Sequence, residues 1–206
     1  MAVKRKPKGF MRSYFCEKKA YNVLKDSFFD KGTTVCGFNK GQFSSIDILS
    51  AVLSFTGTAD VVIGTWSLGK NEAAKVAELV GAKLISDVKW IVDGTMLTLH
   101  GDVFKCLLSL FDSKKIKVLK THAKFFLIKN KDWHVVVETS MNLNKNTRLE
   151  SFSVTEDRRF YDSYEALVED VFKIKLDESA QTHSPEKQGY ATLMALPERE
   201  KERRRE

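Results

Sequence analysis

The 206-residue sequence contains few cysteines and prolines and no long hydrophobic run. Its three cysteines, Cys16, Cys36 and Cys106, form no CxxC pair, which argues against a disulfide scaffold or zinc knuckle and fits reduced thiols in a cytoplasm. The most apolar stretch, residues 46–63, includes two aspartates and is too short and polar to cross a bilayer. No apolar segment of a signal peptide follows the basic residues 1–8. We therefore expect a cytoplasmic protein without stable membrane association.

Proline is absent from the interior of the chain. The three prolines stand near the two ends, at Pro7, Pro185 and Pro197. An uninterrupted interior predicts one continuous domain over residues 14–176, and the length suits a single domain with a full core. A basic arm over residues 1–13 is expected before it. A charged tail over residues 177–206, mobile or helical only at its end, is expected after it, because its central part lacks hydrophobic periodicity.

Positive charge is concentrated at the N-terminus. Residues 1–25 contain eight lysines or arginines and a single acidic residue, so their net charge of +7 equals that of the whole chain. The last ten residues have a net charge of +1, which leaves the body of the chain at −1. A basic arm commonly contacts nucleic acid or another polyanion, and a solubilising leader is the alternative.

Strand-like and helix-like segments alternate along the interior. We expect strands over residues 33–38, 60–66, 83–92 and 150–154. We expect helices over residues 14–29, 44–55, 71–80, 102–111 and 161–172. Ser44 suits an N-cap, and Gly81 suits the position after a helix. The inner face of the first helix is expected to hold Tyr21, Leu24 and Phe28, and that of the last Tyr164, Leu167, Val168 and Val171. Such units predict an α/β layered sandwich, a mixed β-sheet flanked by helices.

A β-hairpin is expected in the stretch 115–152. Two apolar runs, Ile116–Ile128 and Trp133–Thr139, flank the polar linker Lys129–Asp132. A three-residue loop would pair Lys129 with Trp133, and the same register would place His122 opposite Ser140. Polar side chains then cluster on the hairpin, from His122, Lys124, Glu138, Ser140 and Asn142.

An imidazole, an ammonium, a hydroxyl and an amide form a group suited to an anion. A histidine can attack phosphorus to give a covalent intermediate, and lysine and asparagine can hold the non-bridging oxygens. Each piece alone has an ordinary interpretation: His122 as a surface histidine, Lys124 as a solvated lysine, and Ser140–Asn142 as a strand-ending turn. All of these residues together are far less frequent by chance than any one piece alone.

The joint pattern resembles the phospholipase D superfamily, whose signature is HxK, an Asp four residues further on, Gly-Ser-x-Asn and a trailing acidic residue. The matching residues, about thirty positions in extent, are His122-Ala123-Lys124, Thr139-Ser140-Met141-Asn142, Leu143-Asn144, Asn146, Arg148 and Glu150. The run SMNLNKNTRLE looks like the short, nuclease-type branch of the superfamily. Two positions depart from the pattern: Lys129 stands where Asp is usual, and Thr139 stands where Gly is usual.

The resemblance implies a phospholipase D-like fold and a phosphodiesterase that needs no metal or other cofactor. It implies that His122 is the nucleophile, that Lys124 and Asn142 bind the phosphate, and that Ser140 and Glu150 position the site. The family chemistry uses two HxK histidines, one attacking and one protonating the leaving oxygen. This chain has one such motif, so the resemblance implies a homodimer with the active site shared at its two-fold axis.

The surroundings of the motif favour nucleic acid, DNA or RNA, as the substrate. Seven lysines lie between Lys114 and Lys131, although solvated lysines of an edge strand are the alternative. Weaker candidates for nucleic-acid contact are Lys117, Lys120, Asn144 and Arg148. The other histidines, His100, His134 and His183, lack the motif and are expected to be structural or surface residues. Two alternatives stay open: an inactive binding module, favoured by the two departures, and a lipid-directed phosphodiesterase.

Overall fold

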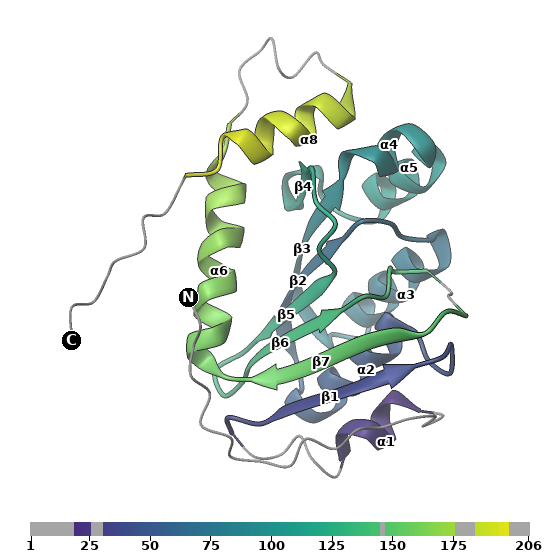
Figure 1. Cartoon of the computed structure of the whole chain (residues 1–206), viewed down its shortest axis with the longest axis vertical. Coiled ribbons are helices and arrows are strands. Elements are labelled where there is room, and N and C mark those ends of the chain that lie inside the picture. Colours follow the sequence, from purple (N-terminus) through teal and green to yellow (C-terminus); the bar gives the residue numbers. More distant parts are fainter. Residues whose placement is uncertain (1–18, 26–30, 145–146, 176–183, 198–206) are drawn as a thin grey trace, which may run out of the picture.

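The computed structural model describes residues 19–25, 31–144, 147–175 and 184–197, so the predicted basic arm lies outside the described residues. These residues form an α/β structure around a seven-stranded mixed sheet (Figure 1). The strands are β1 (Thr34–Asn39), β2 (Ala59–Thr65), β3 (Ile85–Asp93), β4 (Ile116–Leu119), β5 (Phe125–Lys129), β6 (His134–Thr139) and β7 (Glu150–Glu156). The helices are α1 (Ala20–Lys25), α2 (Ser45–Thr56), α3 (Lys70–Gly81), α4 (Gly94–Leu99), α5 (Gly101–Leu110), α6 (Arg158–Lys173) and α8 (Pro185–Met194), with a 3-10 turn, η1 (Ser113–Lys115).

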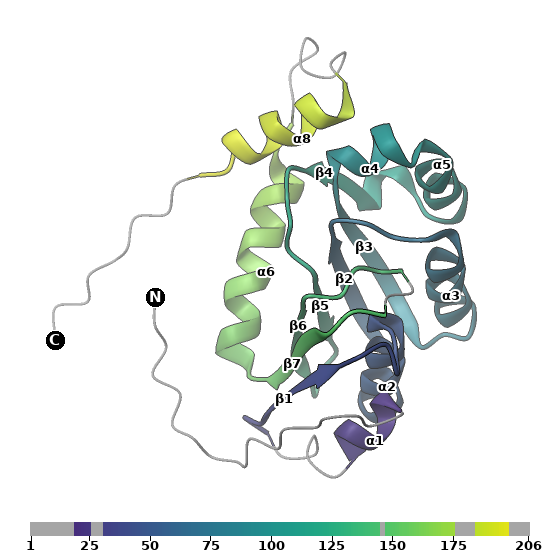
Figure 2. The ribbon, with the colours of Figure 1, turned by 45° about the vertical axis from the view of Figure 1, so that its right-hand side comes forward.

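The strand order is β1-β7-β6-β5-β2-β3-β4. β2, β3 and β4 are parallel, and every other neighbouring pair is antiparallel. The C-terminal ends of β1, β2, β3, β4 and β6 therefore meet the N-terminal ends of β5 and β7 at one edge of the sheet, which we call the site edge. Helix α6 covers one face of the sheet, and the helices α1 to α5 lie on the other side (Figure 2).

Both faces of the central strands are buried, which explains their continuous apolar sequence. Residues 125–128 and 134–137 are buried without alternation, as expected for strands covered on both sides. The larger core, between the sheet and α1 to α5, includes the fully buried Trp90 and Phe126. The smaller core lies under α6 and includes Leu127, Val136 and Val168. The predicted α/β sandwich with a mixed sheet is confirmed at this level.

Helix ends show where local sequence chemistry predicted the structure and where it did not. Ser44 caps α2, and its hydroxyl accepts from Asp47 N at 3.3 Å while the Asp47 carboxylate accepts from Ser44 N at 2.7 Å, a complete capping box. Gly81 is the last residue of α3, and the left-handed residue is Lys83, with φ of 58°. The prediction of a glycine after the helix was therefore wrong by one position.

Two predicted helix faces need correction. On α6 the buried side chains are Tyr161, Val168 and Val171, whereas Leu167 is 45% exposed. On α1, Val23 and Leu24 are buried, Tyr21 is exposed with its ring stacked on Phe55, and Phe28 lies outside the described residues. Helix α4 was not predicted at all; it is six residues long, too short to show helical periodicity.

The predicted hairpin is also corrected, because the run Ile116–Ile128 is two strands. β4 lies at the outer edge of the sheet and β5 at its centre, with β2 and β3 between them. The residues 120–124 cross the site edge without strand structure and join the two. Both halves of the run are apolar and no glycine or proline marks the break, so the pattern read as a single strand.

The register of the real hairpin, β5 with β6, differs by one residue from the prediction. Lys129 pairs with His134 instead of Trp133, which leaves a four-residue turn and does not place His122 opposite Ser140. The four-residue turn is stabilised by Asn130, whose side-chain oxygen accepts from Asp132 N at 2.9 Å and Trp133 N at 3.0 Å.

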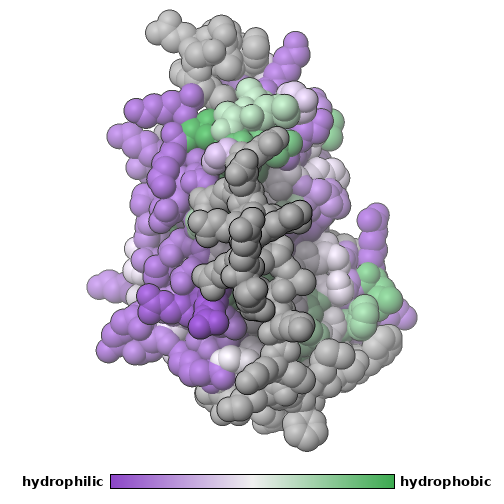
Figure 3. Space-filling view, turned by 60° about the vertical axis from the view of Figure 1, so that its left-hand side comes forward, coloured by the Kyte–Doolittle hydropathy of each residue, from purple (hydrophilic) through white to green (hydrophobic). Residues whose placement is uncertain are grey.

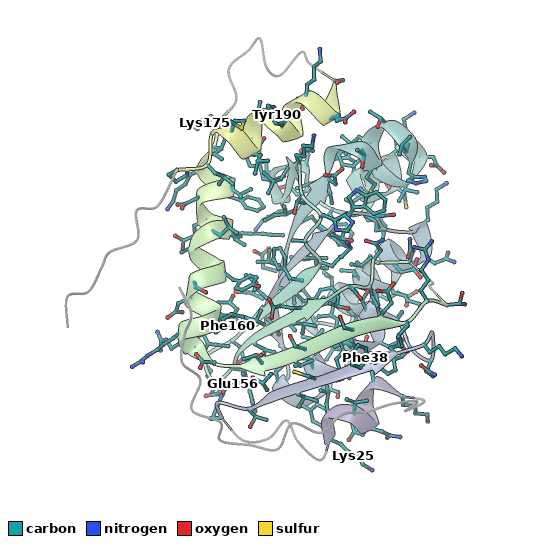
Figure 4. All side chains as sticks on the ribbon, in the orientation of Figure 1. Lys25, Phe38, Glu156, Phe160, Lys175 and Tyr190 are labelled. Atoms are coloured by element: carbon teal, nitrogen blue, oxygen red, sulfur yellow. The ribbon has the colours of Figure 1, made fainter. Side chains whose placement is uncertain are left out.

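Helix α8 packs against the end of β4 and replaces part of the expected tail. Gly189 O accepts from Lys120 N at 2.9 Å, and a Cβ on Gly189 would lie 3.1 Å from that same nitrogen. Tyr190 on α8 and Lys175 after α6 mark this end of the molecule in Figure 4. Figure 3 shows apolar side chains gathered near α8, where Leu193 and Met194 are exposed, and hydrophilic ones over the α6 side. The prediction that the tail, residues 177–206, is helical only at its end was wrong, because α8 lies in its centre.

Replacing Gly64 with alanine is expected to destabilise the fold by roughly 1–3 kcal/mol, as overpacking does. Gly64 on β2 pairs with Phe125 on β5, and an added Cβ would overlap the Phe125 ring. The matched control is Gly101→Ala, where an added Cβ meets nothing within 4 Å. Urea unfolding of both variants measures the difference, and equal free energies of unfolding would contradict the packing argument.

Candidate active site

The loop of residues 120–124 carries His122 across the site edge and is fixed by backbone hydrogen bonds. Thr121 N donates to Asp93 Oδ2 at 2.8 Å, and Ala123 N donates to Thr121 Oγ1 at 3.1 Å. At its start Lys120 N donates to α8, and at its end Lys124 O accepts from β6 at 3.1 Å. A segment without strand or helix structure is thus held on every side, so the position of His122 is defined.

His122 and Lys124 contact each other directly. Lys124 Nζ lies 3.1 Å from His122 Nδ1 and 3.2 Å from Nε2, and it donates to His122 O at 2.9 Å. An ammonium can only donate, so either ring nitrogen could accept from it, and the tautomer of His122 decides which one does. The Trp66 ring lies beside the imidazole, with 5.4 Å between ring centroids. The exposed His122 and the buried Lys124 thus form one unit.

Burial changes the chemistry of the lysine. Lys124 is 8% exposed. Removal from water lowers the pKa of its ammonium below the ordinary 10.5, and the nearby negative charge of Glu150 partly opposes this shift. A partly desolvated cation gains more from an incoming anion than a solvated one does. The site therefore offers a cation that favours a bound phosphate.

The Ser140 hydroxyl links the ends of β6 and β7. It donates to Glu150 Oε2 and accepts from Ser151 N at 2.9 Å, while Ser140 N donates to Ser151 O at 3.0 Å. Glu150 is the first residue of β7, so its carboxylate lies at the site edge and fixes the orientation of the serine hydroxyl. The predicted role of Glu150, to position the site together with Ser140, stays a prediction.

Asn142 has a buried side-chain oxygen, Oδ1, with no hydrogen-bond partner among the described residues. Its backbone is fixed, because Asn142 O accepts from Ser45 Oγ at 3.2 Å and the next residue, Leu143, pairs with residues of the segment after β2. Buried polar atoms are nearly always paired, so this oxygen is an exception. An amide oxygen only accepts, so a contact of Asn142 with a phosphate would have to come from its Nδ2 group.

A cleft of about 600 Å³ joins several of the predicted site residues. Its lining comes from the loop before β5, the ends of β6 and β7, and α6: His122, Ala123, Lys124, Phe125, Glu138, Thr139, Ser140, Ser151, Phe152, Ser153 and Tyr164. The structure thus brings His122, Lys124 and Ser140 together. Asn142 and Glu150 lie at the same edge, next to the lining residues, without lining the cleft themselves.

Three residues of this region were missed as site residues by sequence reasoning. Asp93 and Trp66 each stand at the C-terminal end of a parallel strand, β3 or β2, where α/β proteins place ligands, and this rule could have found them. Tyr164 comes from α6 and carried no signal beyond its place in a helical pattern. Its hydroxyl donates to Glu138 Oε1 at 2.5 Å inside the cleft.

The weaker nucleic-acid candidates lie outside the cleft lining. Lys117 Nζ donates to Ile174 O at 2.9 Å, and Lys120 Nζ lies 5.5 Å from the centre of the Tyr190 ring on α8. Asn144 is half-buried and Arg148 is exposed, both in the connection between β6 and β7 at the site edge. Asn146, between them in the matched pattern, lies outside the described residues. Their predicted contacts with nucleic acid stay predictions.

The two departures from the family pattern have structural partners. Lys129 lies at the opposite end of β5 from His122 and forms an ion pair with Glu165 of α6, with Nζ 3.0 Å from Oε1. Thr139 Oγ1 donates to Ser151 O at 2.9 Å and accepts from Met141 N at 3.0 Å. Among the described residues other than glycine only Lys83 has a positive φ, so the backbone at position 139 does not require glycine.

The remaining histidines lie apart from the cleft lining. His100 is exposed at the junction of α4 and α5, and His183 lies outside the described residues. His134 is buried, with its ring edge-on to Tyr161 at 5.5 Å. Burial lowers the pKa of His134, and the positive charges of Arg158 and Lys129 lower it further. The ring of His134 packs against Tyr161 as part of the structure.

In comparisons with known proteins, no protein-family model and no curated sequence matches this chain. Across residues 19–25, 31–144, 147–175 and 184–197, no three histidine, cysteine or acidic side chains are grouped closely enough to hold a metal ion. None of the helices in these ranges has the length and hydrophobicity needed to cross a membrane.

Proposed function

We propose that this chain is a phosphodiesterase with a phospholipase D-like fold, which cleaves DNA or RNA without a metal ion. The observation that carries the proposal is the contact of His122 with Lys124 in a cleft beside Ser140. A nucleophilic nitrogen, a partly desolvated cation and a hydroxyl around one space are the groups that phosphoryl transfer needs.

In the proposed reaction His122 attacks the phosphorus, and the N–P bond forms as the bond to the leaving oxygen breaks. A second histidine, the partner subunit's His122, protonates that oxygen. Water then attacks the phosphohistidine with the second histidine as base, which releases a phosphate monoester and restores both rings. Lys124 and Asn142 bind the non-bridging oxygens, and the pair Ser140 and Glu150 positions the site.

A homodimer that shares this site agrees with the surface around it. Three large apolar side chains are exposed near the site edge: Phe38 towards the end of β1 (46% exposed), Trp66 after β2 (37%) and Leu149 before β7 (59%). Phe38 is labelled on the outermost strand in Figure 4. Exposed apolar side chains are candidates for an interface, and a two-fold interface at the site edge would bring both copies of His122 together.

The test of this function is cleavage of labelled single- and double-stranded DNA and RNA by the purified chain in EDTA. We expect cleavage in EDTA, a dimeric mass in solution and a phosphohistidine that can be trapped at early times and located by mass spectrometry. A strictly monomeric protein, or no cleavage of any nucleic acid, would reject the proposal. Binding of nucleic acid without cleavage would select an inactive binding module instead.

The rate of cleavage is expected to fall at alkaline pH as Lys124 loses its proton, and to do so below 10.5 because the pKa of this lysine is lowered. The titration of Lys124 should also be visible in the stability of the fold. Between the lowered pKa and 10.5 the folded state releases its proton before the unfolded state does, so the free energy of unfolding rises with pH across that window. Below the window both states are protonated and the full cost of burying the charge is present.

Rate profiles and thermal unfolding across this pH range measure both effects. In Lys124→Met the alkaline rise in stability should disappear and cleavage should be lost. The exposed Lys75 on α3 provides the matched control, Lys75→Met, which should keep the pH dependence of the wild type. An alkaline rise that persists in Lys124→Met would assign it to another group.

A further inference from the structure

Glu138 places a carboxylate inside the proposed phosphate-binding cleft. It lies on β6, where Phe125 is its cross-strand partner, and it lines the cleft together with His122 and Lys124. A carboxylate repels a phosphate, so it does not serve the phosphate itself. A cleft that holds both groups has one end for the phosphate and another end for a part of the substrate that donates hydrogen bonds.

The hydrogen bonds of Glu138 leave one free acceptor position on each oxygen. Oε1 accepts from the Tyr164 hydroxyl at 2.5 Å, and Oε2 accepts from the Ser153 hydroxyl at 3.2 Å. An ionised carboxylate has about four acceptor sites, two on each oxygen. The two that remain suit a ligand with two parallel N–H donors, and the two hydroxyls hold the carboxylate in place for it.

An aromatic side chain, Tyr164, lies beside this carboxylate. The Tyr164 ring lines the cleft and is held edge-on by Phe125, at 5.7 Å, and by Phe160, at 5.2 Å. Phe160, on the first turn of α6, is labelled in Figure 4. Unpaired nucleobases are recognised by stacking on aromatic side chains and by hydrogen bonds along the Watson–Crick edge. That edge is free only in single-stranded nucleic acid.

We infer that the Glu138 end of the cleft binds an unpaired guanine next to the phosphate that is cleaved. Guanine carries two adjacent donors on its Watson–Crick edge, N1–H and the 2-amino group, which match the two free acceptor positions of the carboxylate. Adenine and cytosine each offer an amino group flanked by an acceptor, and thymine and uracil offer one N–H flanked by two carbonyls. The inference rests on the proposed function and adds to it a substrate class, single-stranded nucleic acid with a guanine at the cleavage site.

The test is the affinity for short oligothymidylates that contain one central guanine, inosine or adenine, measured by fluorescence anisotropy. The full chain with His122→Ala is used so that no substrate is consumed. Guanine should bind roughly 10- to 100-fold more tightly than adenine, as bidentate base contacts do. Inosine lacks the 2-amino group and should fall between them. Glu138→Gln should remove this ranking, because its amide replaces one acceptor by a donor.

Glu78→Gln, at an exposed glutamate of α3, is the matched control and should keep the ranking. Equal affinity for the three oligonucleotides, or an unchanged ranking in Glu138→Gln, would overturn the guanine site alone. Guanine-selective binding by a wild-type protein that never cleaves would keep the site and reject the phosphodiesterase. Binding of phosphocholine in place of any oligonucleotide, lost in Glu138→Gln, would assign the carboxylate to a cationic headgroup and overturn the inference.

Discussion

Replacing His122 with alanine is expected to lower cleavage of nucleic acid by on the order of 10⁴-fold or more, the size of effect seen when a nucleophile is removed. His122 supplies the nitrogen that forms the covalent intermediate, and Lys124 Nζ contacts this ring at 3.1 Å. Without the imidazole no phosphohistidine forms and the leaving oxygen has no proton donor, because the same residue fills both roles in the dimer.

His100→Ala is the matched control for this substitution. His100 is exposed, lies between α4 and α5 and is not among the residues that line the cleft, so its loss should leave the rate unchanged. Measurements of single-turnover cleavage and of the trapped intermediate on both variants separate the two histidines. Cleavage by His122→Ala at the rate of the wild type would show that the phosphodiesterase activity resides elsewhere or comes from a contaminant.

The sequence was most informative where hydrophobic patterns extend over many residues. β2, β3 and α2 were expected within one or two residues of their observed bounds, because each has an apolar run or a capping residue of its own. The group of His122, Lys124 and Ser140 was also predicted together, and the structure brings these residues into one cleft. The observed arrangement differs from the predicted one, because His122 lies on the loop that crosses the site edge and not opposite Ser140 in a hairpin.

The features of the fold and site that were not predicted depend on contacts between segments distant in the sequence. Nothing local separates β4 from β5 in the run Ile116–Ile128; the break arises because β4 pairs with β3 and β5 with β2. Helix α8 has a polar, weakly periodic sequence and is placed by its contact with Lys120. Tyr164 and Glu138 are 26 residues apart and meet only because α6 packs on the sheet beside β6. A hydrophobic pattern over a short stretch of sequence contains no information about such long-range pairings.

The carboxylate of Asp93 is expected to matter nearly as much as the cleft residues themselves. Asp93 is 4% exposed, and its two oxygens serve two elements. Oδ1 accepts from Thr95 N at 2.8 Å and so caps α4, and Oδ2 accepts from Thr121 N at 2.8 Å, one residue before His122. One side chain thus contributes hydrogen bonds both to helix α4 and to the loop that carries the histidine.

Asp93→Asn should lower the free energy of unfolding by roughly 1–3 kcal/mol, because an amide has one acceptor oxygen and one of the two elements loses its hydrogen bond. If the loop loses it, a shift of His122 by about 1 Å would reduce the catalytic rate by roughly 100-fold. A shift of the nucleophile slows chemistry more than binding, so the loss should appear mainly in kcat and less in KM.

Asp112→Asn is the matched control, because Asp112 caps the 3-10 turn η1 through a hydrogen bond from Lys114 N at 2.9 Å and is exposed. It should change neither kcat nor the free energy of unfolding appreciably. A fall in stability for Asp93→Asn with full kcat would mean that α4 lost its cap while the loop stayed in place. Loss of both in parallel would show that the hydrogen bond from Thr121 to the end of β3 sets the position of the nucleophile.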